Sequence, residues 1–255
     1  GDVYKRQNVE AVFMNSDTVL LKEIIERAKN IVFFGGAGVS TESGIPDFRS
    51  SDGLYNQKYK YPPEQIVSHT FFKYNTEEFY RFYRDKMIYC EAKPNKAHIA
   101  LAELEKSGKL SCVITQNIDG LHQMAGSKNV FELHGSIHRN YCLKCGEKYG
   151  LDKIIGTEGI PTCDLCGGIV RPDVVLYEEG LNPEILNGSI KSLRKADVLI
   201  IGGTSLGVYP AAGLIHEFTG DKIVLINKSV TPADKTADLV IREPIAQVLK
   251  EAVLM

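Results

Sequence analysis

The sequence predicts an α/β protein in which helices cover both faces of a parallel sheet and a second, smaller unit is inserted into it. Three observations along the 255 residues lead to this prediction. Short apolar runs recur, amphipathic stretches separate most of them, and two segments interrupt the alternation. Most of the runs are apolar without a break, which is typical of strands buried on both faces of a parallel sheet. Strands that alternate with helices favour a doubly wound fold.

A first helix is predicted from Ser16 or Asp17, since either residue can cap a helix. Apolar residues then recur with the helical period of about 3.6, at Leu20, Leu21, Ile24, Ile25 and Ala28. The predicted strands are residues 31–34, 112–114, 130–133, 198–201, 223–226 and 239–241. The clearest predicted helices between them are residues 96–105 and 183–195.

Two segments do not fit the alternation and are predicted insertions. Residues 51–92 are rich in Tyr and Phe and carry helical signals, which predicts a helical module. Residues 138–170 are polar and carry four of the six cysteines. The sheet domain is therefore expected to be discontinuous, made of residues 14–50, 93–137 and 171–255. Residues 1–13 show neither helical nor strand period, and we expect them to be a non-native extension before Met14.

The composition limits the partners that we expect. The formal net charge is −2 and Lys and Arg form no cluster, so the charge favours neither nucleic acid nor a membrane surface. Strongly apolar runs such as residues 198–201 fall far short of the ~18 residues that a membrane span needs, and no signal peptide is visible. We therefore expect a cytoplasmic protein that binds neither nucleic acid nor a membrane.

The four clustered cysteines predict a structural zinc site. They form two Cys-x2-Cys turns, Cys142 with Cys145 and Cys163 with Cys166. The number of residues between the two turns lies in the range expected for a zinc ribbon. Two disulfides or four unrelated thiols are the alternatives, but a reducing compartment disfavours disulfides. Four thiolates close the coordination sphere, which disfavours a catalytic zinc, although His134 or His138 could in principle replace one cysteine. Cys112 lies in an apolar run and is predicted to be an inert core residue.

The stretch "FFGGAGVSTESGIPDFRS" begins as a dinucleotide-binding turn does. An apolar run meets Gly35, Gly36 and Gly38, which would let the backbone approach a pyrophosphate. Thr41 then stands where a third glycine is expected, and Pro46 ends any helix that would carry the phosphate. These departures disfavour an ordinary dehydrogenase.

Three polar clusters follow predicted strands, where an open α/β sheet binds its ligands. They are "TQNIDGLH" from Thr115, "ELHGS" from Glu132 and "GGTSLGVYPAA" from Gly202, and "INKS" follows the next strand. Singly, such loops are usually turns, Asp119 could be a helix cap, and His122 could be a helix residue whose hydrogen bonds are satisfied. His134 lies beside a glycine at a strand end and is placed for proton transfer.

Together these motifs resemble the sirtuins, the NAD-dependent protein deacylases. The similarity runs from about residue 31 to the end and includes "GAGVSTESGIPDFRS", "TQNIDGLH", "HGS", the cysteine pairs, "RPDVVLYEE" and "GTSLGVYPAA". The resemblance implies a Rossmann-like domain, a small domain of zinc ribbon and helical module, and an acyl-lysine peptide in the cleft between them. It also implies that NAD is a co-substrate and that its bond to nicotinamide is broken.

The resemblance assigns roles residue by residue. His134 is the general base toward a ribose hydroxyl, Asn117 orients the ribose, and Asp119 holds the carboxamide. NAD-binding residues would be Gly36, Ala37, Gly38, Ser40, Asp47, Phe48, Arg49, Gln116, Asn117, Ile118, Asp119, Gly203, Thr204, Ser205, Asn227, Lys228 and Ile245. Acyl-lysine would contact Phe48, Val174, Val175, Tyr177 and Gly207, with residues 44–49 as a mobile cover.

Two departures bear on the substrate. Relatives that remove succinyl or malonyl groups carry Tyr-x-x-Arg, but here Tyr80 is followed by Tyr83, with Arg81 and Arg84 at neighbouring positions. We therefore expect deacetylation rather than desuccinylation. Glu178 stands where many relatives have glycine, which would stiffen the peptide-binding segment and favour basic peptides. The alternatives are a mono-ADP-ribosyltransferase, another deacylase, and a non-enzymatic module that binds NAD or ADP-ribose. We expect a monomer.

Overall fold

The larger sheet is parallel and has the strand order β3-β2-β1-β7-β8-β9. The structure is a computed structural model that describes residues 15–47 and 60–255. The predictions for residues 1–13, Phe48 and Arg49 lie outside the described residues. The strands are β1 (Ile31–Gly35), β2 (Leu110–Thr115), β3 (Val130–Glu132), β7 (Val198–Gly202), β8 (Lys222–Ile226) and β9 (Leu239–Ile241). The predicted parallel sheet is confirmed.

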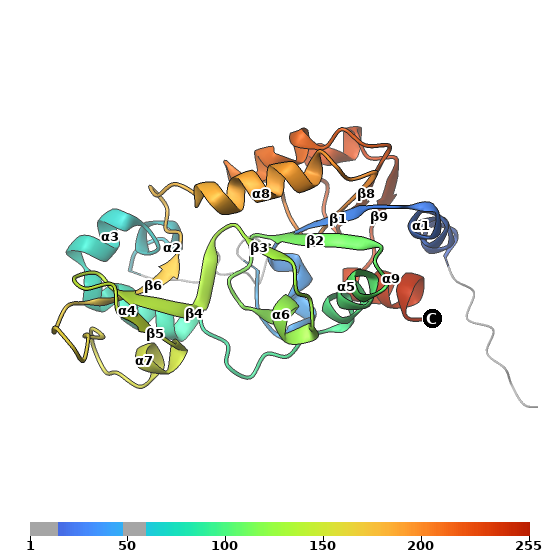
Figure 1. Cartoon of the computed structure of the whole chain (residues 1–255). Helices are drawn as coiled ribbons and strands as arrows, with labels where there is room; N and C mark the ends of the chain where they lie inside the picture. The colour runs from blue at the N-terminus through green and yellow to red at the C-terminus, as the bar shows by residue number, and fades with distance from the viewer. Residues whose placement is uncertain (1–14, 48–59) are drawn as a thin grey trace, which may run out of the picture.

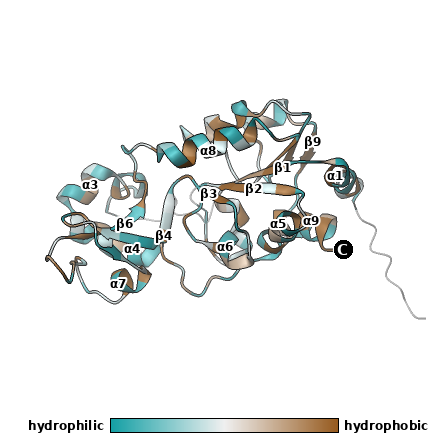
Figure 2. Ribbon diagram, in the orientation of Figure 1, coloured by the Kyte–Doolittle hydropathy of each residue, from teal (hydrophilic) through white to brown (hydrophobic). Residues whose placement is uncertain are grey.

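Helices cover both faces of this sheet (Figure 1). One face carries α1 (Ser16–Arg27), α5 (Lys96–Lys106), α6 (Leu121–Ala125) and α9 (Ile245–Val253); the other carries α8 (Pro183–Leu193) and the 3-10 helix η4 (Ala211–Glu217). Within β1, Ile31 and Phe33 join one apolar cluster while Val32 and Phe34 join the other. Figure 2 shows β1 and β2 as largely hydrophobic, whereas α5 and α8 carry both colours. This double burial explains the unbroken apolar runs.

The first helix starts one residue earlier than predicted. Its N-cap is Asn15, whose side chain accepts a hydrogen bond from the backbone N–H of Asp17. Ser16 is the first helical residue, so neither Ser16 nor Asp17 is the cap. Asn15 accepts because a short side-chain oxygen just before the first turn reaches an N–H that has no partner within the helix.

No α-helix follows β1 directly within the described residues. Two short 3-10 helices take that place, η1 (Ala37–Val39) and η2 (Thr41–Ser43). The glycine turn packs against the loop after β7, where the N–H of Gly38 donates to the carbonyl of Gly203 at 2.8 Å. A Cβ at Gly38 would lie 2.8 Å from the Cα of Gly203, so glycine is required for this approach.

The smaller sheet is antiparallel and lies beyond one end of the larger one (Figure 1). Its strands are β4 (Gly135–Cys142), β5 (Lys148–Tyr149) and β6 (Val170–Val174). The helices α2 (Pro63–Ile66), α3 (His69–Tyr74), α4 (Thr76–Lys86) and α7 (Leu151–Ile155) pack there, and η5 (Pro232–Lys235) precedes β9. One apolar cluster joins aromatic residues of α4 to residues of β4 and β6, so the two predicted insertions share a core. The exact domain boundaries stay predictions.

None of the helices in residues 15–47 and 60–255 has the length and apolarity that crossing a bilayer requires.

Candidate active site

A cavity of about 650 Å³ lies at the C-terminal ends of the parallel strands and extends to the smaller sheet. Most of the predicted site residues line it: Gly36, Ala37, Gly38, Ser40, Asp47, Gln116, Asn117, Ile118, Asp119, His134, Val174, Val175, Tyr177, Gly203, Thr204, Ser205, Asn227, Lys228 and Ile245. Gly207 is not among the described lining residues, although Val208 is. The tertiary structure thus gathers residues that follow all six strands of the parallel sheet into one site, as open α/β sheets do.

The glycine turn and the loops after β2 and β7 form one end of the cavity. The side-chain amide of Gln116 donates to the hydroxyl of Thr204 at 3.1 Å, and its backbone N–H donates to the carbonyl of Gly35 at 3.0 Å. Gly38 holds the turn close to the β7 loop, as described above. These contacts leave backbone amides and small side chains around the cavity, which suits a dinucleotide.

Ser40 joins two predicted site residues in the middle of the cavity. Its hydroxyl donates to Oδ2 of Asp119 at 2.6 Å and accepts from the side-chain amide of Asn117 at 3.1 Å. The other carboxylate oxygen of Asp119 accepts from the backbone N–H of Leu121 at 2.9 Å. Asp119 therefore binds the first N–H of α6 and lines the cavity, but the N-cap residue of α6 is Gly120, so the interpretation of Asp119 as the helix cap is wrong.

A buried histidine supports Ser40 from behind the cavity wall. His98 is completely buried, and burial lowers the pKa of its ring to about 4, with the nearby Asp119 charge opposing. Nδ1 of the neutral ring accepts from the backbone N–H of Asn95 at 3.2 Å, which places the ring hydrogen on Nε2. Nε2 lies 3.5 Å from Oγ of Ser40, a long hydrogen bond. Because Nε2 donates, the Ser40 hydroxyl hydrogen is directed toward Asp119.

His122 packs against His98, with ring centroids 4.7 Å apart. Burial lowers the pKa of its ring to about 3, and the neighbouring His98 adds to the effect. Neither ring nitrogen has a hydrogen-bond partner in the described part of the chain. His122 is thus a buried residue of α6, but the prediction that its ring is satisfied is wrong, because the ring packs against His98 and Phe33 instead of hydrogen-bonding to a described residue.

His134 presents an unprotonated nitrogen to the cavity. Its Nδ1 lies 2.9 Å from the carbonyl oxygen of Gln116; a carbonyl can only accept, so Nδ1 carries the hydrogen. Burial lowers the pKa of His134, and this hydrogen bond partly opposes the effect. The backbone carbonyl of His134 accepts from the N–H of Val175 at 3.0 Å, which ties the residue to the segment after β6. A neutral ring with Nε2 as an acceptor suits a general base.

The segment after β6 runs beside the start of α3. The N–H of Tyr177 donates to the carbonyl of Val67, and the N–H of His69 donates to the carbonyl of Tyr177, both at 3.0 Å. Glu178 follows with φ of 76°, in the left-handed region that favours glycine. The backbone here is therefore held in one conformation by pairing with the helical module.

The four cysteines converge as predicted. Their sulfur atoms all lie within 4.8 Å of one another, with 3.4 Å between Cys142 and Cys166 and 3.6 Å between Cys145 and Cys163. A tetrahedral zinc with Zn–S bonds of about 2.3 Å fits such a set. The hydroxyl of Tyr149 donates to Sγ of Cys163 at 3.2 Å and lowers the pKa of that thiol to about 6. The cluster is consistent with a structural zinc.

His138 is not a candidate zinc ligand, because its Nε2 lies 3.1 Å from the backbone carbonyl of Asp119, away from the cysteines. Cys112 is fully buried, and burial raises the pKa of its thiol to about 11. The prediction of an inert core cysteine is confirmed.

Sequence reasoning missed cavity-lining residues from the helical module. Val67, Tyr83, Lys86, Met87 and Tyr89 all line the cavity. Val67 follows α2, and the others lie on α4 or just after it. The helical spacing of Tyr83 and Met87 predicts a buried face, but that pattern does not say what the face is buried against. The contact depends on how the module packs, which no local signal carries.

Comparison with known proteins agrees with this geometry. A family model described as "Sir2 family" matches residues 36–210. The chain is 61% identical over 236 residues to an NAD-dependent protein deacetylase of Clostridium acetobutylicum, covering 91% of this chain and 96% of that protein. The NAD-dependent protein deacetylase of Clostridium perfringens is 62% identical over 236 residues, with 91% and 97% covered.

Solved structures show the same fold. One, described as the structural basis for the mechanism and regulation of Sir2 enzymes, has a TM-score of 0.86 at 40% identity and covers 94% of this chain and 98% of its own. Another is Sir2 with the inhibitor EX-527, 2′-O-acetyl-ADP-ribose and a deacetylated p53 peptide, with a TM-score of 0.80 at 37% identity, covering 91% and 96%. On sequence and structure alike, the chain belongs to the Sir2 family.

Proposed function

We propose that this protein is an NAD-dependent protein lysine deacetylase. The observation that carries the proposal is His134, whose Nδ1 hydrogen is held by the Gln116 carbonyl so that Nε2 faces the cavity as an acceptor. Acyl-lysine, NAD and water give lysine, O-acyl-ADP-ribose and nicotinamide. The acyl–Nζ bond and the nicotinamide–ribose bond break, an ester bond to a ribose hydroxyl forms, and water supplies the remaining atoms. The relatives named above are NAD-dependent protein deacetylases.

NAD supplies the ribose that accepts the acyl group, and this chain's residues bind and orient it. We assign the phosphates and adenosine to the glycine turn and the β7 and β8 loops, around Gly38, Thr204 and Asn227. The nicotinamide end is assigned to Asn117 and Asp119, where the Ser40 hydroxyl holds Oδ2 of Asp119 in place. His134 takes the proton of a ribose hydroxyl on Nε2. Its lowered pKa supports this role, because the ring stays neutral at pH 7.

The acyl-lysine peptide is assigned to the edge formed by Val174, Val175 and Tyr177. Homologous structures hold p53 peptides. The segment is tied to His134 through the Val175 N–H, so substrate and base are positioned by one piece of backbone. We propose an extended peptide that pairs with this segment.

We propose acetyl as the preferred acyl group over succinyl. Arg84 donates to the carbonyls of Ile154 and Gly159, at 2.8 and 2.5 Å, and Arg81 pairs with Glu78. Neither arginine is among the described residues that line the cavity. Lys86 does line it, with its ammonium 3.1 Å from a carboxylate oxygen of Asp85. A matched pair of acetyl and succinyl peptides tests this preference; faster succinyl turnover contradicts it, and Lys86→Met then tests the cation involved.

We also propose that the protein is a monomer located in the cytoplasm. Four zinc-binding thiolates suit a reducing compartment. Among residues 15–47 and 60–255, the most exposed large apolar side chains, Val230, Leu165, Tyr74 and Tyr209, come from separate parts of the fold. This scatter does not suit a large apolar interface.

One incubation tests the function. Acetyl-lysine peptide and NAD are mixed with the protein, and products are identified by mass spectrometry, with His134→Ala as the matched variant. We expect free lysine and O-acetyl-ADP-ribose from the wild type, and a loss of about 100-fold or more from the variant. ADP-ribose attached to a protein side chain, without free lysine, would instead show a mono-ADP-ribosyltransferase. No consumption of NAD would favour a binding module.

A further inference from the structure

Arg242 contacts a loop that forms part of the cavity wall. It follows β9 directly, and it is not among the described residues that line the cavity. Its Nη1 donates to the backbone carbonyls of Asn227 and Ser229, at 2.9 and 2.8 Å. Asn227, Lys228 and Ser229 are the residues after β8, and all three line the cavity. One guanidinium nitrogen therefore holds both ends of this cavity-lining loop.

The other side of the guanidinium is held by η5. Nη2 of Arg242 forms an ion pair with Oδ1 of Asp234. Oδ2 of Asp234 accepts from the backbone N–H of Thr231 at 2.6 Å and from its hydroxyl at 3.0 Å. An ion pair near the surface contributes little stability by itself. Here it fixes the planar fork of the arginine, so that Nη1 is directed at the two loop carbonyls.

The same loop fixes the side chain of Asn227. The backbone N–H of Asn227 donates to the carbonyl of Ile241 at 3.0 Å, and its Nδ2 donates to the carbonyl of Ser229 at 2.8 Å. The Ser229 carbonyl thus accepts from both Asn227 and Arg242. Because the amide nitrogen is used within the loop, Oδ1 of Asn227 is left as an acceptor. An acceptor oxygen suits the hydroxyl groups of a ribose.

We propose that Arg242 is a positioning residue for the adenosine end of NAD. It holds the loop after β8 so that Oδ1 of Asn227 accepts from a hydroxyl of the adenosine ribose. This inference rests on the proposed function, which assigns adenosine to that loop. Arg242 acts through the loop and touches neither NAD nor the peptide. Its effect is therefore confined to dinucleotide affinity, and the steps at the nicotinamide ribose, beside His134, do not depend on it.

Titration calorimetry with ADP-ribose, together with steady-state kinetics, tests this role. Arg242→Met keeps an unbranched side chain and removes the guanidinium. We expect it to raise the Kd for ADP-ribose and the KM for NAD by about tenfold, the effect of losing a charged hydrogen-bond donor. Arg242→Lys keeps the charge but not the planar fork, so it should recover only part of the affinity. The kcat at saturating NAD, the KM for peptide and the nicotinamide inhibition constant should keep their wild-type values.

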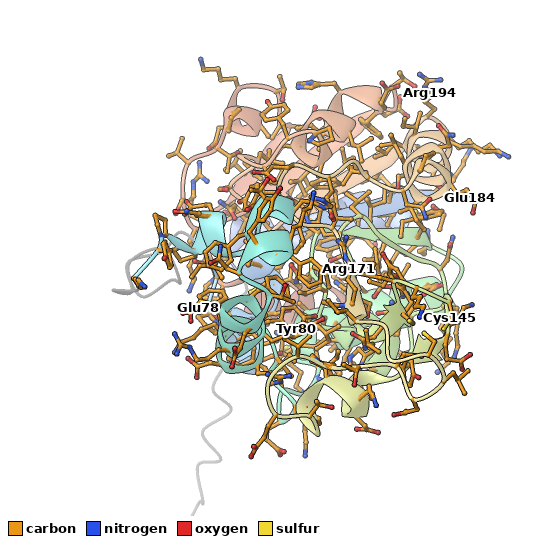
Figure 3. All side chains as sticks on the ribbon, turned by 90° about the vertical axis from the view of Figure 1, so that its left-hand side faces the viewer. Glu78, Tyr80, Cys145, Arg171, Glu184 and Arg194 are labelled. Carbon is orange, nitrogen blue, oxygen red and sulfur yellow. The ribbon has the colours of Figure 1, made fainter. Side chains whose placement is uncertain are left out.

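Arg194→Met is the matched control. Arg194, labelled in Figure 3, lies at the outer edge of the molecule and pairs with Glu217 at 2.6 Å. This variant makes the same change in charge away from the cavity, so its Kd for ADP-ribose should equal that of the wild type. An unchanged Kd in Arg242→Met, or an equal rise in Arg194→Met, overturns the proposal.

A double variant tests whether Arg242 acts through Asn227. Asn227→Ala removes the acceptor oxygen, so adding Arg242→Met to it should raise the Kd for ADP-ribose much less than in the wild-type background. Losses that multiply would show independent action and overturn the proposal. A loss of affinity with an equal fall in kcat would show a general structural effect and also overturn it. Failure of the proposed function is separate, because then the wild type would not release lysine from an acetyl peptide.

Discussion

The carboxylate of Glu178 accepts two hydrogen bonds from Thr70, one from the backbone N–H at 2.9 Å and one from the hydroxyl at 2.7 Å. These bonds lower the pKa of Glu178, the hydroxyl contributing most. They also connect the segment after β6 to α3, which belongs to the helical module. The structure thus gives a reason for a side chain at a position where the backbone adopts a glycine-like φ of 76°.

Substituting Glu178 should separate backbone strain from the loss of these bonds. Glu178→Ala loses both bonds and keeps a side chain in the left-handed region, whereas Glu178→Gly loses the bonds but removes the strain. We expect the alanine variant to be the less stable of the two in denaturant unfolding, and peptide KM to rise in both. Equal stability of the two variants would mean that the conformation is not strained.

His98 is expected to position Ser40 through its Nε2 hydrogen. His98→Gln can reproduce both contacts, since its amide oxygen can accept from Asn95 and its amide nitrogen can donate to Ser40. His98→Leu removes both. We expect His98→Leu to raise the KM for NAD and the nicotinamide inhibition constant by about tenfold. His98→Gln should keep both constants close to their wild-type values.

Binding of ADP-ribose is the control for that series. It lacks nicotinamide, so its Kd should change little in His98→Leu if the folded cavity is intact. An equal loss of affinity for NAD and for ADP-ribose would show that His98 supports the glycine turn as a whole rather than the nicotinamide end.

The two buried histidines should make the protein unstable toward acid. In the unfolded chain both rings bind a proton near pH 6.5, but the folded pKa values are about 4 for His98 and about 3 for His122. Below pH 6.5 the unfolded state therefore binds more protons than the folded state. For each ring, the free energy of unfolding then decreases by about 1.4 kcal/mol for every unit by which the pH is lowered. This loss continues until the folded pKa is reached.

Variants isolate that contribution. Between pH 6 and pH 4, His122→Leu and His98→Gln should each lose less stability than the wild type, and the double variant less still. Denaturant unfolding at several pH values measures the free energy of unfolding of each protein. The difference between a variant and the wild type cancels the contribution of the carboxyl groups, because the proteins share these groups. Parallel curves for all four proteins would show that the rings do not titrate as buried groups.

Zinc removal should affect the small sheet more than the large one. Chelation or Cys163→Ser removes the zinc that the four thiolates would hold between the end of β4 and the segment before β6, and structural zinc contributes about 10 kcal/mol or more to such units. Deacetylation should be lost, because Val174 and its neighbours belong to this sheet. ADP-ribose should still bind, because the glycine turn lies on the large sheet. Full activity of zinc-free protein, with metal content measured on the same sample, contradicts this.

Much of the fold was predictable because burial on both faces leaves a local pattern. Each predicted strand of the parallel sheet begins and ends within two residues of the observed strand. The agreement is close because continuous apolar runs coincide with the interior of a parallel sheet. The helix cap was less predictable, because Asn15, Ser16 and Asp17 are all good caps and only the geometry of the first turn selects one. The zinc site was predictable from spacing, because each pair of thiolates lies within one turn.

The sequence by itself determined which residues could do chemistry and at which strand ends they lie: the cysteine pairs, the glycine turn, Asp119 and His134. The tertiary structure alone decided which nitrogen of His134 is free, that His98 lies behind Ser40, and that the described residues leave both ring nitrogens of His122 without a hydrogen-bond partner. The physical reason is that periodicity and spacing report burial and local turns, whereas hydrogen-bond direction and a side chain's partner depend on contacts between segments far apart in the chain.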